Sequence, residues 1–140
     1  MKQKNERPVD RIRALADWLI ANKVIKSVSK FEEVCGLSRH YVKNLMQTEK
    51  GNPGVDTLAA IYEVFPSVSL KWLVVGKGPM FTSRNETELI ERMKLDMISH
   101  EVLAVTTGNK DLKDALKKAL VEHKDDLTAD EKIALLERLL

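Results

Sequence analysis

Apolar residues recur every three or four positions along almost the whole chain, and this helical periodicity limits the possible folds more than any other feature of the sequence. The first stripe has the spacing i, i+3, i+4, i+7, i+8 and consists of Ile12, Leu15, Ala16, Leu19 and Ile20. An α-helix places such residues on one face. No segment shows the sustained alternation of apolar and polar residues typical of a half-buried strand. We therefore predict an all-α fold.

Residues that start or end helices divide the first half of the chain into short segments. Ser27 and Ser38 are the expected N-caps of two of them, because a serine hydroxyl can accept a hydrogen bond from a free N–H of the first turn. Gly36 and Pro66 are expected stops. The predicted helices cover about residues 8–20, 28–35, 39–47, 58–65 and 70–74.

The second half of the chain carries its own helix signals. Asn85 with Glu88, and Thr128 with Glu131, have the three-residue spacing of a capping box. Gly108 separates the helix that follows Asn85 from another rich in Leu and Ala. A run of Gly, Pro, Thr and Ser before this region marks a boundary. We divide the chain into residues 1–81, a linker at 82–88 and a helical region at 89–140.

Charge is distributed unevenly between the two halves. Residues 1–84 hold 14 Lys and Arg against 8 Asp and Glu, a net charge of +6. Residues 85–140 hold 9 against 13, a net charge of −4, so the chain as a whole carries +2. A basic front and an acidic back indicate that only the front contacts a polyanion.

Composition and cysteine content indicate a folded cytoplasmic protein. Hydrophobic residues make up 44% of the chain and charged residues 31%, as in soluble globular proteins. Cys35 is the only cysteine, which excludes an internal disulfide, and we expect it to be a buried thiol. No apolar run is long enough for a signal peptide or a membrane span, so we expect no membrane partner.

Two motifs carry a family resemblance. Phe31-Glu32 followed by Gly36-Leu37-Ser38 is typical of two short helices that meet at a tight turn. Further along, Trp72-Leu73 precedes a Gly-x-Gly-x-Met pattern at residues 76–80. In this order and spacing, the motifs resemble the lambda-repressor-like (xenobiotic response element) helix-turn-helix family, and in particular phage-repressor-type regulators of Bacteroidetes bacteria. The resemblance covers roughly residues 9–81 and implies a compact five-helix domain, with Phe31 and Trp72 expected in its core.

The resemblance also implies which side chains contact DNA. Carried over by position, the base-reading residues at the start of the recognition helix are Arg39, His40 and Asn44. Arginine can form two hydrogen bonds with guanine, and asparagine can do the same with adenine. The residues expected to flank them or to contact phosphates are Lys26, Val28, Ser29, Lys30, Ser38, Tyr41, Lys43, Gln47 and Lys50. Among these, the backbone amides of Val28 and Ser29 would bind a phosphate at the start of the second helix.

Two functions are consistent with these features. The first is a sequence-specific regulator that binds double-stranded DNA and represses transcription by occupying an operator. The alternative is a protein-interaction module of the antitoxin or adaptor type, because the acidic residues Glu32 and Glu33 lie close to the expected path of DNA. His40 also departs from the small or amide residues that the Bacteroidetes group often has there.

We expect no enzymatic activity, cofactor or metal site. Many repressors of the resembling family carry a self-cleaving peptidase, which needs a β-rich domain, and the 56 residues after Arg84 are too few and too helical for one. His40, His100 and His123 are scattered and lack the spacing of zinc ligands. The sequence identifies no small-molecule inducer.

The C-terminal region is expected to pair subunits. Its helices carry apolar stripes, one of which comprises Ile133, Leu136, Leu139 and Leu140. Three short helices seldom bury such stripes alone, so a second subunit is expected to cover residues 85–140 in a homodimer or higher oligomer. Two-fold pairing would place two recognition helices about 34 Å apart and favour a palindromic operator.

Overall fold

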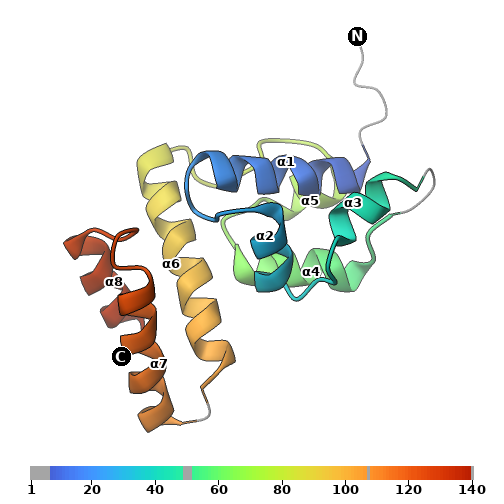
Figure 1. Cartoon of the computed structure of the whole chain (residues 1–140). Helices are drawn as coiled ribbons and strands as arrows, with labels where there is room; N and C mark the ends of the chain where they lie inside the picture. The colour runs from blue at the N-terminus through green and yellow to red at the C-terminus, as the bar shows by residue number, and fades with distance from the viewer. Residues whose placement is uncertain (1–6, 49–51, 107, 140) are drawn as a thin grey trace.

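The computed structural model describes residues 7–48, 52–106 and 108–139, and in these ranges the regular secondary structure consists of eight helices (Figure 1). The all-α prediction is confirmed. In chain order, the helices are α1 (Pro8–Ala21), α2 (Val28–Val34), α3 (Tyr41–Met46), α4 (Val55–Val64), α5 (Leu70–Val75), α6 (Glu86–Ala104), α7 (Asn109–Glu122) and α8 (Ala129–Leu139).

The first five helices surround an apolar core. The stripe predicted on α1 faces inward, and Ile12, Leu15 and Leu19 have no exposed surface. Phe31 of α2 and Phe65 after α4 are also fully buried, and their rings lie stacked with centroids 6.4 Å apart. Burying large aliphatic and aromatic side chains stabilises a fold by about 1.5 to 3 kcal/mol each. The core positions predicted for Phe31 and Trp72 are confirmed.

A buried arginine joins α1 to the end of α5. The guanidinium of Arg11 donates to the carbonyl oxygens of Leu73, at 3.1 Å, and Val74, at 3.0 Å. These carbonyls belong to the last turn of the helix, where they have no intrahelical partner. Gly76 then ends α5 with a φ of +81°, and its Cα faces the guanidinium of Arg11 so closely that a Cβ would lie 2.7 Å from Nη1. Glycine is required there for both reasons.

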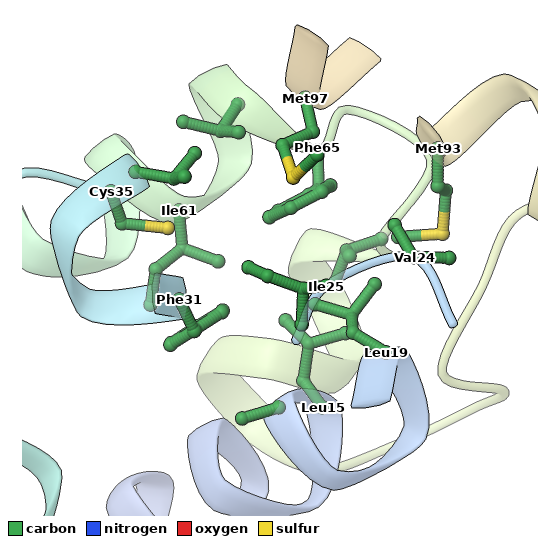
Figure 2. Close-up of a cluster of buried hydrophobic side chains, with 14 of the residues drawn as sticks. Leu15, Leu19, Val24, Ile25, Phe31, Cys35, Ile61, Phe65, Met93 and Met97 are labelled. Atoms are coloured by element: carbon green, nitrogen blue, oxygen red, sulfur yellow. The ribbon is translucent and has the colours of Figure 1, made fainter. Parts of the chain in front are cut away.

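Helix α6 packs against both halves of the molecule. It begins at Glu86, with the side chain of Asn85 accepting a hydrogen bond from the Glu88 amide at 3.1 Å, so the last three residues of the predicted linker 82–88 are helical. One side of α6 contacts α2 and α4, and Met93 and Met97 join the N-terminal core beside Val24 and Phe65 (Figure 2). The buried side chains of both halves form one continuous cluster.

Helices α7 and α8 cover the other side of α6 (Figure 1). The predicted capping box is present at the start of α8: the Thr128 amide donates to Glu131 at 3.0 Å, and the Glu131 amide donates to Thr128 Oγ1 at 3.1 Å. This register buries Leu135 completely and leaves Ile133 54% exposed. Ile133, in the stripe expected to need a cover from a second subunit, is therefore exposed, whereas Glu131 and Leu135, four residues apart, are buried.

Candidate nucleic-acid interface

The surface to which the sequence assigns DNA contact begins with α2 and the turn that follows it. Ser27 caps α2 as predicted, its Oγ accepting a hydrogen bond from the Lys30 amide at 3.1 Å. Gly36 ends the helix with a φ of +72°, and the next amide, that of Leu37, donates back to the Glu32 carbonyl at 2.8 Å. This is the left-handed helix end that glycine favours. It reverses the chain sharply before α3.

A buried carboxylate holds the start of α3 against α2. The side chain of Glu32 accepts a hydrogen bond from the His40 amide at 3.1 Å with one oxygen, and from the Val42 amide at 2.9 Å with the other. Glu32 is only 3% exposed. Two free N–H groups at the start of a helix thereby gain a buried acceptor from another helix.

This contact explains why α3 starts later than predicted. Ser38 is not its N-cap: the carbonyl of Ser38 accepts from the Tyr41 amide at 3.1 Å in a turn, and the N-cap is His40, whose φ is +63°. Histidine adopts this conformation more readily than most residues. Arg39 and His40 therefore precede the helix instead of forming its first turn. The Glu32 carboxylate supplies the acceptor that the sequence analysis assigned to Ser38.

The side chains around α3 separate into an inward and an outward set. Val42 is completely buried, and Leu45 is half-buried against the core. The outward set is exposed and consists of Arg39, His40, Lys43, Asn44 and Gln47. All three predicted base-reading residues thus lie at the surface, in or just before α3.

Two further contacts fix the position of α3. At its end, the guanidinium of Arg7 donates to the carbonyl oxygens of Met46, at 3.1 Å, and Thr48, at 2.5 Å. Near its start, the hydroxyl of Tyr41 lies 3.2 Å from that of Thr57 in α4, within hydrogen-bond distance. Tyr41 is half-buried, and its hydroxyl already has a partner within the protein, which leaves less of this side chain for the predicted role beside DNA.

A shallow groove of about 320 Å³ lies between the first turn of α2 and α3. It brings together several residues that the sequence analysis assigned to DNA, and its lining includes Val28, Ser29, His40, Lys43 and Gln47. The first turn of α2 and the polar face of α3 thus border the same hollow. Arg13 also lines it, paired with Asp17 at 2.9 Å.

The residues predicted to contact phosphates differ in whether their side chains are exposed or already paired within the protein. Lys26 and Ser38 are exposed, whereas the ammonium of Lys30 lies 2.7 Å from a carboxylate oxygen of Glu101 in α6. Burial by itself lowers the Lys30 pKa, but the hydrogen bond and the charge of Glu101 outweigh it and raise the pKa above the ordinary value of 10.5. Lys30 therefore joins α2 to α6. Lys50 lies outside the described residues.

Sequence reasoning missed Glu32 and Arg7, the two residues that hold α3 from either end. Glu32 was interpreted only as an acidic residue near the path of DNA, although it is only 3% exposed and both of its carboxylate oxygens accept hydrogen bonds from backbone amides. A signal for it existed: a glutamate directly after Phe31 lies on the side of α2 that carries core residues. The role of Arg7 depends on residues 39 and 41 positions away, and no local pattern indicates it.

Comparison of the chain with protein-family models, curated proteins and solved structures gave no match. Among the described residues, no cluster of three or more His, Cys, Asp or Glu side chains could hold a metal ion. None of the described helices has the length and apolar character needed to cross a membrane.

Proposed function

We propose that the chain binds double-stranded DNA through α3 and the groove beside it, as a sequence-specific transcriptional regulator of the lambda-repressor-like helix-turn-helix type. One observation supports this more than any other. A buried carboxylate and a left-handed glycine fix α3 against α2 and leave exposed the polar side chains in and just before α3: Arg39, His40, Lys43, Asn44 and Gln47. A solvated surface helix needs no such anchoring, whereas a helix that reads bases must be held rigidly.

The chemistry of the exposed residues suits the major groove. The guanidinium of Arg39 can form two hydrogen bonds with guanine, and the amide of Asn44 can form two with adenine. Lys43 carries a charge beside them, and the exposed Lys26 precedes the first turn of α2, where the chain would meet the phosphate backbone. Repression follows most simply from this arrangement, because it requires only that the protein occupy an operator.

A direct experiment is selection from a pool of random 30-base-pair duplexes by the full-length protein, followed by fluorescence anisotropy on the enriched sequence at several salt concentrations. Arg39→Ala and Asn44→Ala should each weaken binding by about 1 to 3 kcal/mol and relax the preference at one base pair. Binding by the unaltered protein should weaken steeply with salt as counterions compete. Lys50→Ala should weaken all duplexes alike.

The control variant is Arg84→Ala, which removes an exposed arginine just before α6 that does not line the groove beside α3. It changes the net charge by the same amount as Arg39→Ala and should leave the base preference unchanged. If no sequence is enriched, or if Arg39→Ala and Asn44→Ala behave like Arg84→Ala, the assignment of α3 as a recognition helix is wrong.

The protein-interaction alternative loses part of its basis in the structure. It depended on Glu32 and Glu33 as an acidic surface, and Glu32 is buried with both carboxylate oxygens bonded to backbone amides. Glu33 alone remains exposed. We therefore favour DNA over a protein partner for this face.

We further propose that residues 85–140 mediate self-association, through a smaller exposed apolar surface than the sequence suggested. Much of the apolar stripe of α7 is covered within the chain, with Leu116 and Ala119 buried against the common core. Among the described residues of this region, the large apolar side chains that remain exposed are Leu103, Val105, Val121 and Ile133. Sedimentation of the full-length protein at micromolar concentration tests the proposal, which a monomer would contradict.

A further inference from the structure

A second hollow lies on the side of the molecule where the two halves meet. It has a volume of about 490 Å³ and is bounded by the end of α1, the α1–α2 connection, α6 and the α7–α8 connection. Its apolar lining comes from both halves and consists of Ile20, Val24, Ile25, Met97, Ile98 and Leu127. Figure 2 shows Val24, Ile25 and Met97 among these core side chains. Pockets of about 300 to 1,000 Å³ with such linings are typical of small-molecule sites.

The charged groups at the edge of this junction pocket are not balanced. Four lysines line it: Lys23, Lys26, Lys30 and Lys94. Lys30 is paired with Glu101 at 2.7 Å and Lys94 with Glu131 at 3.7 Å. Lys23 and Lys26 are exposed and form no ion pair with another described residue. The α1–α2 side of the pocket therefore presents two uncompensated ammonium groups.

The acidic groups of the opposite wall are already engaged. The carboxylates of Glu122 and Asp126 lie 3.5 Å from the two ring nitrogens of His123. The carboxylate of Glu101, at 3.8 Å, and that of Asp126 raise the pKa of this imidazole above its ordinary value of 6.5, although burial opposes them. Glu122 and Asp126 thus lie against His123, and neither forms an ion pair with Lys23 or Lys26.

The backbone also brings Lys23 to this position under strain. Lys23 closes α1 with a φ of +60°, a left-handed conformation at which glycine is usual and other residues cost about 1 kcal/mol. The Val24 amide donates to the Leu19 carbonyl at 2.9 Å across this turn. A lysine at this position, where glycine is usual, adds a positively charged side chain to the lining of an apolar pocket.

We propose that the junction pocket binds a small amphipathic anion, with an aliphatic or aromatic body against the apolar lining and a single carboxylate facing Lys23 and Lys26. The site shares Lys26 with the proposed DNA contact, but its ligand contacts neither α3 nor the groove beside it, so ligand binding can be measured in the absence of DNA. It would make the junction between the N-terminal helices and the α6–α8 region the receptor for a small molecule.

The probe is decanoate at submicellar concentration, added to the full-length protein labelled at its methionine methyl groups. Met97 lines the pocket, whereas Met46 lines the groove beside α3 and serves as an internal control. The Met97 methyl signal should shift in a saturable manner with one equivalent bound, and the Met46 signal should not. Absence of saturable binding, or a shift at Met46 without one at Met97, overturns the proposal.

Charge variants test the orientation of the ligand. The double variant Lys23→Glu with Lys26→Glu should weaken decanoate binding by about tenfold or more, since two attractions become repulsions. Lys71→Glu with Lys77→Glu makes the same change in net charge at exposed sites outside the pocket and should leave binding unchanged. Equal binding of decanoate, decanol and decylammonium, or equal weakening by the two double variants, would show that no carboxylate is recognised.

Discussion

Replacing Glu32 by Gln removes the charge that holds the start of α3 while keeping the size of the side chain. The carboxylate accepts from the His40 and Val42 amides, at 3.1 and 2.9 Å, in a site only 3% exposed. A glutamine can accept from one of these amides, but its NH₂ group then faces the other, which stays buried without an acceptor. Losing one charge-assisted bond and stranding one buried N–H costs about 3 kcal/mol in unfolding free energy.

Urea unfolding followed by circular dichroism measures this cost. With a slope of about 2 kcal/mol per molar urea, the loss lowers the midpoint by about 1.5 M. Amide hydrogen exchange adds a local reading, because the protection of His40 and Val42 should fall more than that of the α1 amides. The control is Glu33→Gln, one residue along α2, whose exposed carboxylate is 3.9 Å from Lys30. If Glu32→Gln shifts the midpoint no more than Glu33→Gln, the carboxylate does not anchor α3.

Three further changes have defined outcomes. Gly76→Ala should lower the free energy of unfolding by about 1 kcal/mol more than Gly78→Ala, as measured by urea unfolding. Both positions have a φ of +81°, but only at Gly76 would a Cβ lie 2.7 Å from a buried guanidinium. Equal losses of stability in the two variants would contradict this. Neighbouring carboxylates raise the pKa of His123, so its protonated form stabilises the folded state. This contribution to the free energy of unfolding should be complete below pH 6.5 and lost as the pH rises through the pKa of the folded state. His123→Gln should lack this dependence of stability on pH. Burial raises the pKa of Cys35 to about 12, so the native thiol should react with a disulfide reagent about a thousandfold more slowly than in urea, and equal rates would show that it is accessible.

Local signals in the sequence were sufficient to predict most of the helix boundaries. Ser27, Asn85 and Thr128 cap the helices that were expected to start at them, and Gly36 ends α2 with positive φ. Each of these features depends on hydrogen bonds between residues no more than five positions apart. Such bonds form wherever the chain turns in that way, so residue type and spacing alone reveal them.

The tertiary structure alone decided how the candidate site is held and which of its lysines are free. Glu32 caps a helix that begins nine residues later, and Lys30 is paired with Glu101, 71 positions away. Helix α6 likewise shares its core with the N-terminal helices instead of starting a separate one. In each case the partner is selected by how helices pack against one another. The sequence by itself determined where the helices form and which side chains are polar, and packing determined which of those side chains are left for a partner.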